Sequence, residues 1–288
     1  MTFREARRWA EQRLEGLDNP LLEAELLIRH VMEWPFHELI LHLDDGMPPG
    51  PMNIFMDLVE RRRKREPLQH ITGSVDFIDR TFSTGPEALV PRPETETLTL
   101  LFSRILYRPS ALLDLGTGSG VIAVSLALAF PEASVVASDI SPDALCLASK
   151  NRRDHGADNL LLLAGDLLAP FSPGARFDGI IANLPYIPTG EIGGLDAEVS
   201  KGDPRVALDG GPDGLDLIRK LVEEAPKHMS RGGVLALEMD PRQVRPVSMS
   251  MKKGSSFISV TVHDDLTGRP RFVTARKRDG GNLFYEDE

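Results

Sequence analysis

The clearest chemistry in the chain lies in four consecutive residues at the end of an apolar segment: Asn183, Leu184, Pro185 and Tyr186. The preceding residues 177–182 are mostly apolar and predict a buried strand. The asparagine amide can both accept and donate a hydrogen bond, and the proline stiffens the turn that carries it. The tyrosine adds a flat ring with a polar tip. The group suits a planar amine held by two acceptors beside a ring, although strand-end Asn and Pro are also ordinary turn residues.

A glycine-rich turn lies upstream, after a second apolar run at residues 111–115. It consists of Gly116, Thr117, Gly118, Ser119 and Gly120. Alternating glycines let the backbone approach a ligand closely, and the helix predicted over residues 121–130 presents free N–H groups at its start. The spacing G-x-G-x-G after an acidic residue differs from the G-x-G-x-x-G of dinucleotide-binding turns. It therefore favours a ligand with a carboxylate and an ammonium, such as the methionine part of S-adenosylmethionine (SAM).

Two acidic residues mark the ends of two further predicted strands. Asp139 ends the strand predicted over residues 134–139, where an acid can accept both hydroxyls of a ribose. Asp166 follows the strand predicted over residues 159–165, where it could meet an adenine amino group. Each acid alone could be a solvated strand end. Ligands of open α/β sheets bind at the carboxyl ends of the strands. The glycine turn, Asp139, Asp166 and residues 183–186 all fall there, so their combination predicts a SAM-dependent methyltransferase.

Composition narrows the class of protein. A chain of 288 residues is long enough for one large or two modest domains. The single cysteine, Cys146, excludes an internal disulfide framework and a multi-cysteine zinc site, so we expect a reducing cytoplasmic setting and no metal. We see no secretory signal, and the longest apolar run, residues 121–130, is too short to span a bilayer.

The net charge of the chain indicates which kinds of partner it can bind. The net charge is −10, and affinity for nucleic acid usually rests on phosphate neutralisation by Lys and Arg, so we expect no direct nucleic-acid partner. The basic run at residues 61–65 opposes this balance. It predicts a solvated helix face, with a partner-docking surface as the alternative. We expect a monomer.

Chain order predicts three parts. Residues 1–78 carry apolar residues at helical spacing and predict a small helical domain. Residues 79–93 predict a β-hairpin connector, with turn residues at 83–86. From residue 94 to residue 288, strands alternate with helices, which predicts a mostly parallel α/β catalytic domain.

The C-terminal part of this domain has its own pattern. Residues 257–264 and 270–278 alternate polar and apolar side chains and predict a closing antiparallel pair. Before them, Pro241 and Pro246 interrupt the expected covering helix, which we therefore predict to be short or irregular. Residues 279–288 are polar and predict a frayed tail.

The ordered set of motifs resembles the peptide chain release factor N5-glutamine methyltransferases (the PrmC/HemK family). The matching segments are residues 66–73, 91–96, 114–120, 183–186 and 206–215. The resemblance implies a Rossmann-like, SAM-dependent methyltransferase fold with a mostly parallel seven-stranded sheet, preceded by a helical bundle for substrate recognition at residues 1–78. It also implies methyl transfer to a glutamine amide in the Gly-Gly-Gln loop of release factors.

The resemblance implies a role for each motif position. The glycine turn would line the methionine end of SAM, Asp139 would hold the ribose, and Asp166 and Leu167 would flank the adenine. Asn183 would lie between cofactor and substrate. Leu184, Pro185 and Tyr186 would complete the substrate site.

Three positions depart from the family pattern. Leu184 replaces a proline, His70 replaces a usual tyrosine, and Leu167 replaces a common aromatic residue. The Asn-Leu-Pro-Tyr order is typical of ribosomal RNA adenine dimethyltransferases, so an exocyclic-amine RNA or DNA methyltransferase is one alternative. A catalytically degenerate SAM-binding module is the other. Chain order and acidic charge favour the glutamine methyltransferase.

Overall fold

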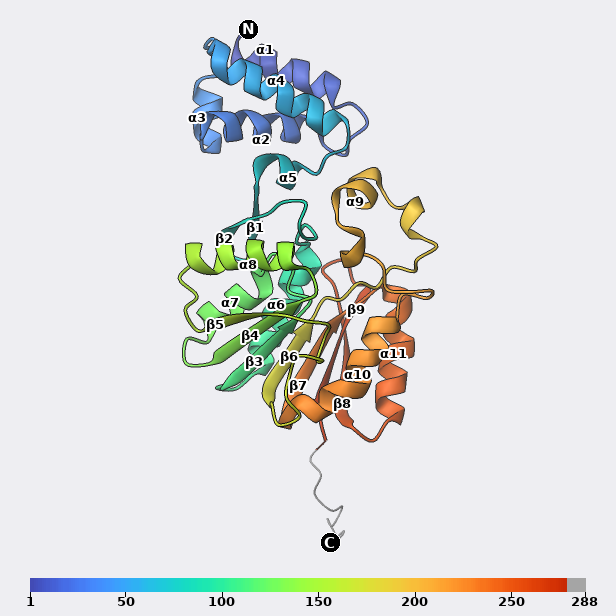
Figure 1. Ribbon diagram of the computed structural model, residues 1–288. Helices are drawn as coiled ribbons and strands as arrows, with labels where there is room; N and C mark the ends of the chain where they lie inside the picture. Colours follow the sequence, from blue (N-terminus) through green and yellow to red (C-terminus); the bar gives the residue numbers. More distant parts are fainter. Residues whose placement is uncertain (279–288) are drawn as a thin grey trace. The chain divides into compact units, whose positions relative to one another are not determined.

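The computed structural model describes residues 1–278, which form two compact units (Figure 1). One unit comprises Met1–Ser74 together with Leu195–Gly202, and the other comprises Val75–Gly194 with the chain from Asp203 on. The division proposed from sequence order (1–78, 79–93 and 94–288) did not place residues 195–202 with the helices. The tail prediction for residues 279–288 lies outside the described residues.

The first unit is helical, as the apolar spacing predicted. Its helices are α1 (Phe3–Arg13), α2 (Pro20–Met32), α3 (Phe36–Leu41), α4 (Pro49–Arg63), α5 (Leu68–Thr72) and α9 (Ala197–Gly202). A capping box between Thr2 and Glu5 starts α1, and Pro20 and Pro49 occupy first-turn positions where no N–H partner is needed. The core of this unit holds the buried side chains of Phe3, Leu27, Phe55 and their neighbours.

The prediction that residues 61–65 form a solvated face is wrong for Arg62. Its side chain is buried, and its guanidinium donates to the carboxylates of Glu23 and Glu198, at 2.7 Å for Nη2 to Glu198 Oε1. Burial lowers the pKa of Arg62, but the hydrogen bonds that it donates to both carboxylates raise this pKa above its ordinary value. Arg61 and Arg63 pair with acids near them in sequence. A buried charge needs partners, and the partner on α9 is distant in sequence.

The β-hairpin lies earlier in the chain than predicted. Strands β1 (Ser74–Phe77) and β2 (Arg80–Ser83) pair in a two-stranded sheet, so the turn falls at Ile78 and Asp79 and not at residues 83–86. Ile78 adopts a left-handed φ of 59°. The turn was missed because β-branched residues rarely take that conformation, whereas the Gly-Pro pair downstream is a strong turn signal that here belongs to a loop.

The second unit contains the predicted, mostly parallel seven-stranded sheet, in the order β5-β4-β3-β6-β7-β9-β8. The parallel strands are β3 (Ala111–Leu115), β4 (Ser134–Asp139), β5 (Leu160–Ala164), β6 (Phe177–Ala182) and β7 (Met229–Glu238). The antiparallel pair is β8 (Phe257–Asp264) and β9 (Pro270–Lys277), which confirms the predicted closing pair. The chain order reverses between β3 and β6, and ligands of such sheets bind at that reversal.

Helices cover both faces of this sheet. They are α6 (Pro93–Ile105), α7 (Val121–Ala129), α8 (Pro142–Asp154), α10 (Asp216–His228) and α11 (Pro241–Lys253), with short 3₁₀ turns at Ile192–Gly194 and Arg205–Ala207. Alternate strand residues face opposite ways. Accordingly, Leu112 and Ile181 pack with α6 and α7 in one core, whereas their neighbours Leu113 and Ile180 pack with α10 and α11 in the other.

The prediction of a short or irregular helix after β7 is wrong, because α11 runs for 13 residues. Pro241 occupies its first turn, and Asp240 and Gln243 form a capping box, so this proline assists the helix start. Pro246 does lie inside the helix and removes one main-chain hydrogen bond. Burial of Val244, Val247 and Met251 against the sheet offsets that loss.

Candidate active site

A cavity of about 510 Å³ opens at the carboxyl ends of β3, β4, β5 and β6. This volume falls within the range of small-molecule sites, roughly 300–1,000 Å³. Ten of the sequence-predicted site residues line it: Gly116, Thr117, Gly118, Ser119, Asp139, Asp166, Leu167, Asn183, Leu184 and Pro185. Gly120 and Tyr186 are not part of its wall. The carboxyl-end rule therefore brought most of the predicted residues together.

The glycine turn is shaped by its neighbours at two points. Gly120 has a left-handed φ of 81°, and a Cβ there would lie 2.9 Å from the Cβ of Ala148, so only glycine fits between α7 and α8. Gly116 has a φ of 70°, and its Cβ would lie 3.1 Å from Leu184 Cδ2. The turn after β3 and the segment after β6 therefore approach each other closely at the cavity wall.

Two carboxyl groups hold the turn. The amide of Gly118 donates to Asp139 Oδ2 at 2.8 Å, and Ser141 N donates to Asp139 Oδ1 at 2.9 Å. Behind the turn, the hydroxyl of Thr117 donates to the buried Asp114 Oδ2 at 2.6 Å. Burial, with a smaller contribution from the charge of Asp139, raises the pKa of Asp114 to about 7. Asp139 remains at the cavity wall, where its lone pairs can also meet hydroxyl groups of a ligand.

The far side of the cavity is formed by the segment after β5. Asp166 is held by an ion pair of 2.7 Å between its Oδ2 and Lys220 Nζ. Leu167 is buried and adopts a left-handed φ of 48°. An apolar surface and a carboxylate thus stand side by side, an arrangement that can meet the flat face and the amino group of an aromatic base.

Asn183 is held at the end of β6 by two successive side-chain hydrogen bonds. Its Nδ2 donates to Thr95 Oγ1 at 3.0 Å, and Thr95 Oγ1 donates to Glu238 Oε2 at 2.9 Å. Within residues 1–278, no hydrogen-bond donor reaches Asn183 Oδ1. The side chain therefore lines the cavity with an acceptor oxygen available.

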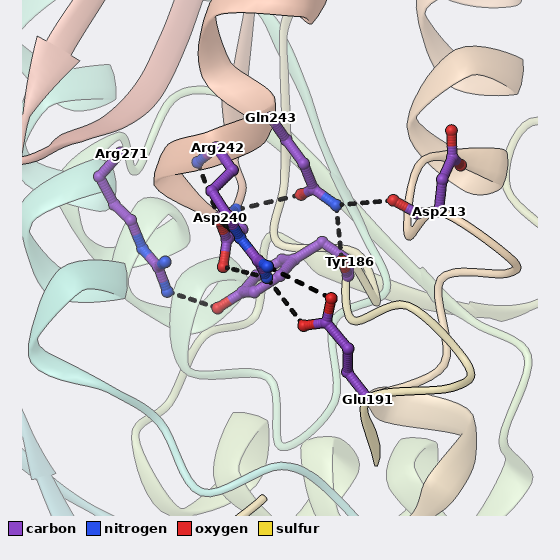
Figure 2. A network of polar contacts seen from close by, with 7 residues as sticks. All are labelled: Tyr186, Glu191, Asp213, Asp240, Arg242, Gln243 and Arg271. Atoms are coloured by element: carbon purple, nitrogen blue, oxygen red, sulfur yellow. Dashed lines mark hydrogen bonds and ion pairs between the residues drawn. The ribbon is translucent and has the colours of Figure 1, made fainter. Parts of the chain in front are cut away.

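Tyr186 is anchored at both ends behind the cavity wall (Figure 2). Its hydroxyl accepts a hydrogen bond from Arg271, whose guanidinium also lies 5.0 Å from the centre of the tyrosine ring. Its carbonyl accepts from Gln243 Nε2 at 2.8 Å. Burial raises the pKa of Tyr186 to about 12, and the charge of Glu238 acts in the same direction. Tyr186 therefore stays neutral and holds the turn to β9 and α11.

Comparison with known proteins assigns the chain to a family. A family model described as the PrmC N-terminal domain matches residues 5–73, and one described as a methyltransferase domain matches residues 109–238. The release factor glutamine methyltransferase of Moorella thermoacetica is 39% identical over 97% of this chain and 100% of its own length. That of Deinococcus radiodurans is 40% identical over 92% of this chain and 94% of its own. The chain belongs to the release factor glutamine methyltransferase family.

Solved structures agree on the fold of this family member. A methyltransferase from Pyrococcus furiosus superposes with a TM-score of 0.51, at 20% identity, over 69% of this chain and 89% of its own. Both the predicted family resemblance and the Rossmann-like methyltransferase fold are thus confirmed. Among residues 1–278, no helix is long and apolar enough to cross a membrane.

The motif at residues 206–215 has a structural task in this methyltransferase. The segment runs beside the residues after Tyr186, with an amide-to-carbonyl bond of 2.9 Å from Gly210 to Ile187. A Cβ on Gly210 would lie 2.6 Å from the Pro185 carbonyl oxygen, and one on Gly214 would lie 2.1 Å from the Tyr186 carbonyl oxygen. The glycines of this motif therefore let a second loop close directly over the Asn-Leu-Pro-Tyr turn.

Sequence reasoning missed three polar residues that support the site: Thr95, Glu238 and Arg271. Glu238 is 1% exposed, and burial raises its pKa to about 7 despite Arg271 Nη2 at 3.4 Å from its Oε1. A signal was present, because Glu238 ends a buried apolar strand, as Asp139 does. Thr95 carried less signal, since it lies in the first turn of a helix where polar residues are common.

Proposed function

We propose that this methyltransferase transfers the methyl group of SAM to the side-chain nitrogen of the glutamine in the Gly-Gly-Gln loop of peptide chain release factors. The observation that carries the proposal is the Asn183 amide, held at the cavity wall with its oxygen available. The names of the relatives, which span nearly the whole chain, support the choice of substrate.

The residues of the cavity fit SAM. The glycine turn would hold the methionine end, because Gly116 and Gly118 line the cavity and, without side chains, leave their backbone open to a ligand. Asp139 would accept from the ribose hydroxyls. Asp166 and Leu167 would meet the amino group and the face of the adenine. Bound SAM supplies a methyl group on a positively charged sulfur.

The protein must make an amide nitrogen nucleophilic. That nitrogen is a poor nucleophile because its lone pair is delocalised into the carbonyl group. Asn183 Oδ1 and the Leu184 carbonyl oxygen would each accept one of the two amide hydrogens and so direct the nitrogen lone pair into the cavity. The carbonyl at position 184 can do this although its side chain departs from the family pattern, since accepting depends only on the backbone.

The remaining steps need positioning more than acid–base chemistry. As the nitrogen takes the methyl group, the sulfur–methyl bond breaks and S-adenosylhomocysteine is left as the neutral product. The nitrogen becomes positively charged and strongly acidic, so one of its hydrogens leaves as a proton without a strong base. Tyr186, anchored by Arg271 and Gln243, would support the turn and help exclude water. Most of the acceleration would therefore come from orientation and from a dry site.

Methylation of an exocyclic adenine amine is the second candidate, because the Asn-Leu-Pro-Tyr order favours it. The net charge of −10 argues against a nucleic-acid substrate. An irregular helix after β7 would have favoured a degenerate SAM-binding module, but α11 is a continuous helix of 13 residues. The proposed substrate also requires a cytoplasmic enzyme.

Labelled SAM offered with release factor and ribosomal RNA in parallel tests the proposal. We expect label in the release factor only, and mass spectrometry should place one methyl group on the glutamine of the Gly-Gly-Gln peptide. Label only in RNA would refute the substrate, and a failure to bind SAM in calorimetry would refute the enzyme. Gel filtration in the same preparation tests the expected monomer.

A further inference from the structure

An asparagine amide can point either way in a site. Its oxygen and its NH2 group have nearly the same shape, and a half-turn about the last side-chain bond exchanges them. Only one orientation of Asn183 can accept a hydrogen from a substrate amide. In the other orientation the NH2 group would face the substrate NH2, and two donors would oppose each other. The structure must therefore select one orientation.

The selecting contact is the hydroxyl of Thr95. A threonine hydroxyl has one hydrogen and can give it to only one acceptor. In this structure the hydrogen goes to Glu238 Oε2 at 2.9 Å, which leaves lone pairs facing Asn183 at 3.0 Å. Lone pairs can pair only with the NH2 group, so Asn183 Oδ1 must turn toward the cavity. Thr95 is 4% exposed and Glu238 1% exposed, which limits the access of water as a competing partner.

We propose that Thr95 and Glu238 are positioning residues that set the direction of the Asn183 amide and thereby make the site an acceptor of planar NH2 groups. The inference rests on the proposed glutamine methylation. Glu238 does not line the cavity, and Thr95 contributes to the cavity wall with only 4% of its surface exposed. Both act through Asn183, in the same way that a hydrogen-bond partner fixes the tautomer of a catalytic histidine.

The charge of Glu238 decides the direction of the hydrogen bonds that link Glu238, Thr95 and Asn183. As a carboxylate, Glu238 can only accept, so Thr95 must donate to it. Once protonated, Glu238 can donate to Thr95, whose own hydrogen then becomes available to Asn183 Oδ1, and the amide can turn over. The charged and titratable groups that face Glu238 are Arg271 on β9, Glu94 on α6 and Tyr186 after β6, while Asp240 before α11 faces Arg271.

These surroundings place the switch near neutral pH. Burial raises the pKa of Glu238 to about 7, Arg271 lowers it, and Glu94 raises it further. The carboxylate, and with it the productive direction of Asn183, is therefore present above that pH and lost as the pH falls below it. If these hydrogen bonds control the reaction, kcat should rise with pH through about 7.

Thr95→Val tests the proposal, because valine keeps the shape and loses the hydroxyl. We expect kcat on release factor to fall at least about tenfold, the effect of one lost hydrogen bond, with SAM affinity within about twofold of wild type. Thr95→Ser should restore kcat. The matched control is Thr99→Val, one turn along α6, where an equally buried hydroxyl donates only to the Thr95 carbonyl. It should keep wild-type kcat.

The pH profile separates positioning from mere packing. Wild-type kcat should rise through about pH 7, whereas Thr95→Val and Glu238→Gln should lose that rise. Unchanged kcat in Thr95→Val, or an unchanged rise in both variants, would overturn the inference while wild-type methylation of release factor still stood. Absence of methylation by the wild type itself would instead refute the proposed function.

Discussion

Two buried charged residues, Arg62 and Glu238, have surroundings that are built in opposite ways. In the helical unit, Arg62 is 3% exposed and has two carboxylate partners, Glu23 and Glu198. In the catalytic unit, Glu238 is equally buried but has Arg271 only at 3.4 Å, and a neutral hydroxyl is its closer partner. The charge of Arg62 is fully paired, and the pKa of Arg62 is raised further from neutrality. The charge of Glu238 is only partly paired, and its pKa is raised to about 7.

The difference shows what each of these residues is for. A fully paired buried charge holds one arrangement of chain segments at every accessible pH, and its loss leaves its partners unpaired. An underpaired carboxyl group can change charge near neutrality, and perturbed groups of this kind gather at functional sites. Arg62 therefore joins α9 to the helical unit, whereas Glu238 controls the direction of hydrogen bonds at the site.

Removal of Arg62 should have the largest effect on stability. Arg62→Ala leaves the partly buried Glu23 without its cation and Glu198 with only Arg65 at 3.7 Å, and it should destabilise the helical unit by about 3–5 kcal/mol. Both tryptophans of the chain, Trp9 and Trp34, lie in this unit, so their fluorescence during urea unfolding reports on it alone. Arg63→Ala, which removes an exposed pair with Glu60, should change stability by less than about 0.5 kcal/mol. Equal effects of the two variants would contradict the structural role of Arg62.

Removal of Asn183 should have the next largest effect, this time on rate. Asn183→Ala removes an acceptor aimed at the substrate and should lower kcat about 10²–10³-fold, the loss typical of one oriented polar group in a site. SAM affinity, measured by calorimetry, should stay near the wild-type value because the glycine turn and Asp139 are untouched. Wild-type turnover in this variant would refute the assignment of Asn183.

Glu238→Gln should stabilise the catalytic unit at alkaline pH while it impairs activity. The folded-state pKa of about 7 lies above the usual value of 4.5, so folding favours the neutral form. Stability from this group is fully present below about pH 4.5 and is lost as the pH rises through about 7.

Glutamine mimics the neutral form and should therefore raise the unfolding free energy at pH 8 by about 1–3 kcal/mol, with little difference at pH 5. Urea unfolding followed by circular dichroism at the two pH values measures this. The exposed Glu132→Gln is the control and should change nothing at either pH. A variant that is less stable than wild type at pH 8 would show that Arg271 pairs with Glu238 more strongly than the geometry indicates.

Tyr186→Phe should have the smallest effect. It removes the hydroxyl that bonds to Arg271, while the ring and the Gln243 bond to the carbonyl remain. We expect a loss of about 1 kcal/mol in unfolding free energy, the usual value of one hydrogen bond, and a kcat within about threefold of wild type. A much larger fall in kcat would mean that the hydroxyl itself takes part in the reaction.

Much of the fold followed from local patterns. The strands β3, β4 and β6 and the glycine turn were predictable because buried apolar runs and positive-φ glycines depend on a few neighbouring residues. The hairpin turn at Ile78 was not, since its left-handed backbone lacks a glycine. The irregularity expected in α11 was overestimated because a proline signal does not reveal how much apolar surface the helix buries.

By itself, the sequence determined the α/β class, the family and ten of the residues that line the cavity, including Asp139 and Asn183. Each of these is encoded by residue type at the end of a strand, and strand ends meet at one edge of a parallel sheet. Only the tertiary structure decided which side chains support them. Thr95, Glu238 and Arg271 come from three separate elements, and so do Glu23, Arg62 and Glu198. The direction of a hydrogen bond and the pKa of a buried acid depend on such distant neighbours, which no local pattern in the chain specifies.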